Sequence, residues 1–287
     1  MHDAIIKEFE QYTTYIPPNP KMALEWCNDI SLTPPKTWLQ ALSLSADCLT
    51  TATKNGNACD VQTAHTLVQI LPMLVSRPPD SSLEDSHVHN FVAPLIKTVF
   101  GEEFQIFWAN GSLSSDLKPD FLVSKEAASS KYNLVVGEVK RPNHRSNQEE
   151  SDLVKLGKEL KVMYNQLVVQ RVSSPVVCGI LIDGFQLSTY TFDLAAPIVY
   201  RMYRVCEVQL FQNIMQLMTL PVILNRIVQL KNIVMETSKK SKQASIEKHC
   251  GQNLSPHLPP LHWLSNQTCS LSRKKACKII KNEILEG

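Results

Sequence analysis

The sequence predicts an α/β fold of the α+β kind, in which a mixed β-sheet is flanked by helices and preceded by an N-terminal helical extension. In the outer parts of the chain, apolar residues recur every three or four positions, as in amphipathic helices. Between residues 104 and 192, short runs rich in β-branched and aromatic residues are separated by turn signals instead. The 287 residues and the apolar fraction of 44% suffice for one large globular domain with additions.

The N-terminal region, residues 1–80, is predicted to consist of helices. Two Pro-Pro pairs separate them, because proline lacks the backbone N–H that a helix interior requires. Residues 63–76 are strongly apolar and predict a helix packed against a core. Nothing in this region suggests chemistry, and the proline-containing stretch 77–80 is its expected boundary.

A further helix is predicted to open the next region. Ser81 followed by Glu84 fits a capping box, and an apolar stripe then continues at helical spacing. Pro94 inside this pattern is expected to bend the helix. Glu84 and Asp85 lie near the stripe, and two interpretations stay open. Acids in a first turn are stabilised by the helix dipole, or one of them reaches over the sheet as a metal ligand.

Three strands follow, and the second and third carry charged residues at ends that would meet. The first covers residues 104–109, the second starts at Asp120, and the third ends in Glu138, Val139 and Lys140. Because side chains alternate along a strand, Glu138 and Lys140 point to one face. If the second and third strands form a hairpin, Asp120 lies beside Glu138. Two carboxylates and one ammonium then meet at the rim of the sheet.

Glu138 ends an apolar row on its face of the strand. The row consists of Tyr132, Leu134 and Val136. A buried acid is costly unless a cation partners it, and a hard divalent cation is one such partner. The alternative is structural: Asp120 caps a turn, and Glu138 with Lys140 forms an exposed cross-strand pair of little energetic weight.

A second amphipathic helix is expected over residues 151–170, where Gly157 indicates close packing on the sheet. Strands at 176–182 and 185–192 follow, joined by an Asp-Gly turn. Helices that pack on the core are expected over 196–236.

The order of helix, three strands, helix and strand, with the motifs Pro119-Asp120 and Glu138-Val139-Lys140, resembles the PD-(D/E)xK nuclease superfamily. The resemblance implies a restriction-endonuclease-like mixed sheet as the core of the protein, at residues 81–195. It says nothing about the N-terminal helices or the end of the chain.

The resemblance also implies a metal site. Asp120 and Glu138 would bind Mg²⁺ or Mn²⁺, and the Val139 carbonyl would supply a further oxygen. Glu84, or Asp85 in second place, would complete the set of ligands. Hard oxygen ligands of this kind suit Mg²⁺.

The catalytic residues implied are Asp120, Glu138, Lys140 and Glu84. The cation would neutralise charge on the scissile phosphate and lower the pKa of a bound water. Lys140 would hold that water or help to deprotonate it. A lysine beside two carboxylates stays charged without metal, so the sequence favours positioning as its role.

The helix after the third strand departs from the Gln-x-x-x-Tyr signature of several branches of the superfamily. Tyr164 precedes Gln166 here, and no tyrosine follows at that spacing. The departure leaves the branch and the substrate open. The candidates for nucleic-acid contacts are Arg141, His144 and Arg145 after the third strand, and Lys155, Lys158 and Gln166 on the helix. The first three also fit a solvated loop.

Charge is unevenly distributed along the chain. Residues 237–287, expected to be a flexible tail, carry nine of the 29 basic and three of the 27 acidic residues. A basic tail suits an anionic partner such as nucleic acid, or it only aids solubility. The eight irregularly spaced cysteines indicate reduced thiols in an intracellular protein, and small basic clusters favour the nucleus. We expect no signal peptide and no membrane span.

The sequence therefore favours a metal-dependent nuclease that hydrolyses the phosphodiester bonds of DNA. The first alternative is a catalytically inactive nuclease-like module that binds nucleic acid or a protein partner. The second is a helical interaction protein, which would be supported if the N-terminal helices covered the Asp120–Glu138 site.

Overall fold

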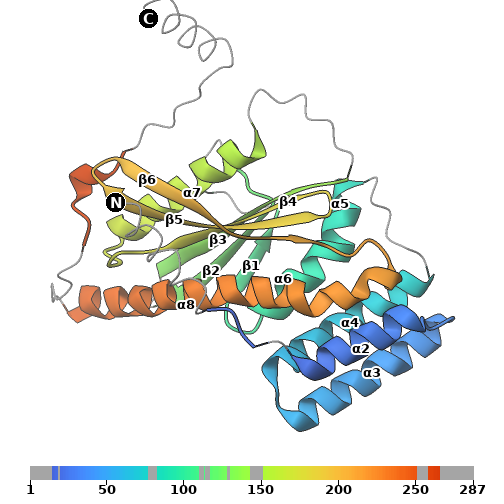
Figure 1. Cartoon of the computed structure of the whole chain (residues 1–287). Coiled ribbons are helices and arrows are strands. Elements are labelled where there is room, and N and C mark those ends of the chain that lie inside the picture. Colours follow the sequence, from blue (N-terminus) through green and yellow to red (C-terminus); the bar gives the residue numbers. More distant parts are fainter. Residues whose placement is uncertain are drawn as a thin grey trace, which may run out of the picture.

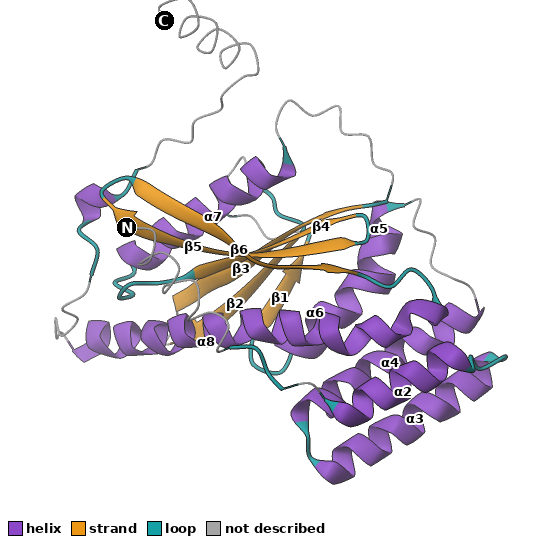
Figure 2. Cartoon of the chain, in the orientation of Figure 1, coloured by secondary structure: helices purple, strands orange, loops and turns teal. Residues whose placement is uncertain are grey.

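A six-stranded mixed sheet forms the centre of the protein, with helices on both faces (Figures 1 and 2). The computed structural model describes residues 15–18, 20–76, 83–109, 113, 117–127, 130–142, 151–250 and 258–265. The strands are β1 (Gln105–Trp108), β2 (Phe121–Ala127), β3 (Ser130–Lys140), β4 (Val177–Asp183), β5 (Gln186–Ala196) and β6 (Val199–Gln209). This confirms the predicted α+β class at the level of a helix-flanked mixed sheet.

The strands lie in the sheet in their chain order, and every neighbouring pair is antiparallel except one. The exception is the parallel pair of β3 and β4, which the helix α7 (Asp152–Val169) connects. A parallel pair requires such a crossover, because the chain must return to the same end of the sheet. The predicted hairpin of β2 and β3 is confirmed, and Gly184, with a φ of 61°, occupies the predicted turn between β4 and β5.

The register assigns the residues of β3 to two opposite faces. Gly137 and Val139 share one face with their partners in β4, whereas Glu138 and Lys140 share the other. Helices α6 (Ala93–Phe100) and α8 (Leu220–Cys250) cover the first face, and α7 covers the second. Glu138 and Lys140 therefore point toward α7.

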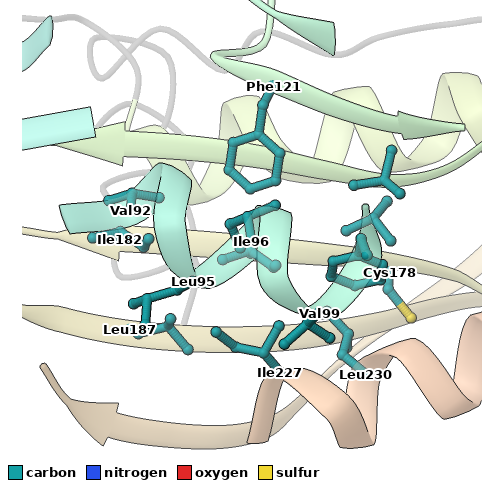
Figure 3. Close-up of a cluster of buried hydrophobic side chains, with 14 of the residues drawn as sticks. Val92, Leu95, Ile96, Val99, Phe121, Cys178, Ile182, Leu187, Ile227 and Leu230 are labelled. Carbon is teal, nitrogen blue, oxygen red and sulfur yellow. The ribbon is translucent and has the colours of Figure 1, made fainter. Parts of the chain in front are cut away.

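The larger part of the core lies between the sheet and the helices α6 and α8, and Figure 3 shows its centre. The labelled side chains from the helices are Val92, Leu95, Ile96, Val99, Ile227 and Leu230, and those from the strands are Phe121, Cys178, Ile182 and Leu187. All of them are buried. By length and composition, the helical stretch Ile214–Lys248 could cross a membrane, but 67% of its most apolar window is buried within the fold, as expected of a core helix.

Helix α7 approaches the sheet closely because Gly179 in β4 has no side chain. A Cβ atom at Gly179 would lie 3.1 Å from Leu156 and from Leu160. Ser151 caps the helix by accepting a hydrogen bond from the Val154 N–H. The close-packing role predicted for Gly157 is wrong. Among the described residues, and apart from the backbone of α7 itself, a Cβ built there has only Met202 Sδ within 4 Å, at 3.7 Å.

The predicted N-terminal helices are α2 (Lys21–Leu32), α3 (Trp38–Asn55) and α4 (Ala58–Ser76). They pack against α6, α8 and the 3₁₀ turn η2 (Ile214–Thr219), and they lie on the α8 side of the sheet (Figure 1). A buried hydrogen bond of 3.0 Å from the Ala23 N–H to Asp60 Oδ1 joins two of them. The described N-terminal helices therefore do not lie over the α7 face of the sheet.

The helix predicted around Pro94 is divided into α5 (Glu84–His87), a π-helical turn η1 (Val88–Val92) and α6. Proline cannot donate to the carbonyl four residues earlier, and the wider turn accommodates this loss. The predicted capping serine, Ser81, and the expected boundary at 77–80 lie outside the described residues. The residue that caps α5 is Leu83, and its side chain makes no capping hydrogen bond.

Two predictions for the C-terminal part are wrong. The expected helices over 196–236 begin instead with strand β6, which pairs with β5 along nearly its whole length. Helix α8 continues to Cys250, well into the predicted flexible tail. The sequence did not predict this part of the helix because its buried face carries hydroxyl residues. Thr237 donates to the Val176 carbonyl oxygen at 2.8 Å, and Ser245 donates to the Ala127 carbonyl oxygen at 3.2 Å.

Replacing Gly137 with alanine is expected to destabilise the fold. The new Cβ would overlap the ring of Phe121, which is fully buried and packed against the Trp108 ring. Overpacking of this kind costs about 1–3 kcal/mol in the free energy of unfolding, measured by urea denaturation. Gly157→Ala is the matched control: it has space for its methyl group, and it should stabilise α7 by up to about 1 kcal/mol. Equal effects of the two substitutions would contradict this account of the sheet.

Candidate active site

Asp120 lies beside the end of β3, as the predicted hairpin required. Its N–H donates to the Gly137 carbonyl oxygen at 3.1 Å, and its Oδ2 accepts a hydrogen bond of 2.6 Å from the Val139 N–H. These two contacts extend the β2–β3 ladder by one residue and hold the carboxylate next to Glu138. The Val139 N–H thus fixes Asp120, and the role of the Val139 carbonyl as a metal ligand stays a prediction.

Glu138 is fully buried on the α7 face, and its counter-ion is Lys155. The Lys155 Nζ lies 2.7 Å from each of the two carboxylate oxygens, and it donates a hydrogen bond to Oε2. It also donates to the Lys118 carbonyl oxygen at 3.1 Å. The acid at the end of this apolar row therefore has a cation partner, and that partner is an ammonium group. The role of Glu138 as a metal ligand stays a prediction.

Glu159 is a member of the site that the sequence interpretation missed. It lies on α7 one turn after Lys155, it is fully buried, and its Oε1 is 3.9 Å from the Lys155 Nζ. Within the described part of the chain, neither of its oxygens accepts a hydrogen bond from an N–H or hydroxyl group, but its carboxyl group lies within hydrogen-bonding reach of Glu138. The signal was present, because Glu159 interrupts the buried stripe of α7 between Leu156 and Met163.

The electrostatics of these groups are those of a crowded, buried site. Burial and the charge of Asp120 raise the pKa of Glu138 to about 7, although Lys155 acts in the opposite direction. Burial and the charge of Glu138 raise the pKa of Glu159 to about 9. Burial disfavours the ammonium of Lys155, but the hydrogen bond and charge of Glu138 outweigh it and raise the pKa of Lys155. Such perturbed groups are typical of functional sites.

Lys140 projects from the same face as Glu138 and pairs with Glu84 of α5. The Lys140 Nζ lies 3.9 Å from Glu84 Oε1, and the Lys140 side chain is mostly buried. Glu84 is thus brought to the end of β3, where its ion pair is with the lysine of the motif. Asp85 is exposed.

His87 connects α5 to the end of β3. Its Nε2 lies 2.9 Å from the Gly184 carbonyl oxygen, and the Gly184 N–H donates to the Lys140 carbonyl oxygen at 2.9 Å. The ring is fully buried between Phe91 and Phe185. His87 therefore holds the helix that carries Glu84 against the strand that carries Lys140.

The remaining candidates are the residues predicted to contact nucleic acid. Arg141 follows β3 directly and is half-buried, as is Lys158 on α7. Gln166 is exposed and follows Lys155 by eleven residues, about 16 Å along the helix, which is too far to reach the carboxylates. His144 and Arg145 lie outside the described residues.

Comparison with known proteins gives no relative of this chain: no family model, no curated protein and no solved structure matches it.

The carboxylates fit a hard cation by their chemistry. No three His, Cys, Asp or Glu side chains are already gathered as a ligand set within the part of the chain that the structure describes. However, both buried oxygens of Glu159 lack an N–H or hydroxyl donor there, and Glu138 Oε1 has the Lys155 ammonium, 2.7 Å away, as its cation partner. Carboxylate oxygens are the ligands that Mg²⁺ and Mn²⁺ favour, and buried polar atoms without a hydrogen-bond donor are uncommon in folded proteins.

His87 is expected to make the stability of the protein depend on pH. Its Nε2 carries the proton shared with Gly184, so Nδ1 has none and finds no partner in the described part of the chain. Burial lowers the pKa of His87 below its ordinary value of 6.5. Its contribution to stability is then fully present above pH 6.5 and is lost as the pH falls below this value, because the unfolded state takes up the proton first.

The measurement is urea unfolding of the wild type and of His87→Gln between pH 7.5 and 5. We expect the free energy of unfolding to fall less steeply with decreasing pH in the variant. The exposed His89, replaced in the same way, is the control and should keep the wild-type slope. Parallel curves for wild type and His87→Gln would rule out this titration.

Proposed function

We propose that this protein is a metal-dependent nuclease of the PD-(D/E)xK type, which hydrolyses the phosphodiester bonds of DNA. The observation that carries the proposal is the meeting of Asp120, Glu138 and Lys140 at the adjoining ends of β2 and β3. Glu138 is fully buried there, which a structural surface pair would not require.

The arrangement of elements supports the same proposal. Helices α5 and α6, strands β1 to β3, helix α7 and strand β4 follow one another in the order expected of a restriction-endonuclease-like core. The parallel pair β3–β4 around α7 directs the charged end of β3 to one rim of the sheet.

Asp120 and Glu138 would hold Mg²⁺ or Mn²⁺, together with the Val139 carbonyl oxygen. When bound, such a cation neutralises charge on a phosphate and lowers the pKa of its bound water. Asp120 contributes an oxygen that the Val139 N–H holds in place. Lys140 contributes a positive charge beside the carboxylates, where it orients a water or a phosphate oxygen.

Glu84 acts through Lys140 in this proposal, since it is the ion-pair partner of that side chain. Arg141 and Lys158, with the predicted residues His144 and Arg145, would contact the nucleic-acid backbone around the site. Such contacts position the substrate without reading its sequence. The basic character of the last fifth of the chain favours the same anionic partner.

One observation favours a second candidate, the catalytically inactive module. The ammonium of Lys155 already neutralises Glu138, so the carboxylates and lysines also form an ion-pair network without any metal. In that case the protein would bind nucleic acid or a protein partner and leave phosphodiester bonds intact.

Nicking of supercoiled plasmid in the presence of Mg²⁺ or Mn²⁺ distinguishes the two. We expect the wild type to nick DNA, and the rate to fall at least about 100-fold in Asp120→Asn and in Lys140→Met, because each loses a group that acts on the reacting atoms. Glu126→Gln, an exposed acid on β2 outside the site, is the control and should retain the wild-type rate. Nicking that survives both site substitutions contradicts the mechanism, and metal-independent binding without nicking supports the inactive module.

A further inference from the structure

Lys155 occupies the middle of a cluster of acids. Its Nζ is 2.7 Å from both oxygens of Glu138 and 3.9 Å from Glu159, and the charge of Asp120 also contributes to the raised pKa of Lys155. One ammonium thus contacts two carboxyl groups, one from β3 and one from α7, and it feels the charge of a third, Asp120, which directly precedes β2. It also donates to the carbonyl oxygen of Lys118.

Lys155 satisfies Glu159 less well than it satisfies Glu138. The Glu159 side chain is fully buried, and a separation of 3.9 Å is too long for a hydrogen bond. In the described part of the chain, its oxygens accept no hydrogen bond from an amide, hydroxyl or ammonium group. The carboxyl group of Glu138 lies within hydrogen-bonding reach, and two buried carboxyl groups this close repel each other unless a proton or a cation lies between them. An ion with two charges and room for several oxygen ligands would satisfy these atoms better than an ammonium with three donors.

We propose that Lys155 marks the position of the divalent cation, and that Glu159 joins Asp120 and Glu138 as a ligand when the cation displaces Lys155. The inference rests on the proposed function, because the cation is the one which the nuclease requires. It differs from the expectation drawn from the sequence, in which Glu84 provided the third carboxylate. Glu84 instead forms its ion pair with Lys140.

The Lys155 side chain is placed so that a cation can displace it. Its side chain is 30% exposed, in contrast to the fully buried carboxylates of Glu138 and Glu159 that it contacts. Lysine carries its charge on a flexible stem with four carbons, so the ammonium can move into solvent while the helix stays in place. Lys155 therefore keeps the acids compatible with folding before the metal arrives, and it opposes metal binding.

The test is the affinity for Mn²⁺ without any substrate, measured by isothermal titration calorimetry. Lys155→Met should bind Mn²⁺ about tenfold more tightly than the wild type, or better, because no charged hydrogen bond has to be broken first. In the Lys155→Met background, Glu159→Gln should abolish most of this gain, whereas Glu84→Gln should leave it intact. Lys97→Met, which removes an exposed lysine on α6, is the control and should bind as the wild type does.

Lys155→Met leaves buried acids without their counter-ion, so its folding is followed as well. Ligand that binds the folded state raises the melting temperature, and Mn²⁺ should raise that of Lys155→Met far more than that of the wild type. An affinity or a melting-temperature gain no greater than that of the wild type overturns the inference, as does a gain in affinity that Glu159→Gln leaves unchanged.

Failure of the inference and failure of the proposed function give different results. If the wild type binds Mn²⁺ and nicks DNA, but Lys155→Met binds no more tightly, the role of Lys155 is wrong and the nuclease proposal stands. If neither protein binds Mn²⁺, both are wrong.

Discussion

A buried carboxylate at the end of a central strand is the constraint around which this protein is arranged. Glu138 has no exposed surface, and an ionised acid in such a place is strongly destabilising without a partner. The crossover helix α7 brings Lys155 to within 2.7 Å of it. The parallel pairing of β3 with β4, the position of α7 and the ion pair therefore depend on one another.

One face of β3 packs against the apolar core, and the other carries the charged residues of the candidate site. On the α6 and α8 side, the Phe121 ring covers Gly137, and the helices bury an apolar layer against it. On the α7 side, the absent side chain of Gly179 lets Leu156 and Leu160 approach the sheet. This close approach is what places Lys155 and Glu159 over Glu138. The apolar face thus supplies the rigidity that a site made of few side chains requires.

The end of β3 is held from a second direction by α5. His87 is hydrogen-bonded to Gly184, Gly184 is hydrogen-bonded to Lys140, and Glu84 pairs with the Lys140 side chain. A π-helical turn follows His87, and Phe91 and Val92 within it are buried, as are most residues of α6 beyond it. A helix irregularity, a glycine turn and a buried histidine together orient one lysine.

The sequence alone was sufficient for the local features. Alternation along β3 assigns Glu138 and Lys140 to one face, and the hairpin pattern brings Asp120 to them, because these relations span few residues and follow from strand geometry. Strand β6 and the last turns of α8 were not predictable in this way. β6 is stabilised by pairing with β5, and the buried hydroxyls of α8 are satisfied by distant backbone groups. Only the tertiary structure decided which cation meets Glu138, and that cation is Lys155. The packing of α7 on the sheet brings Lys155 and Glu159 to Glu138, and no spacing in the sequence specifies that contact.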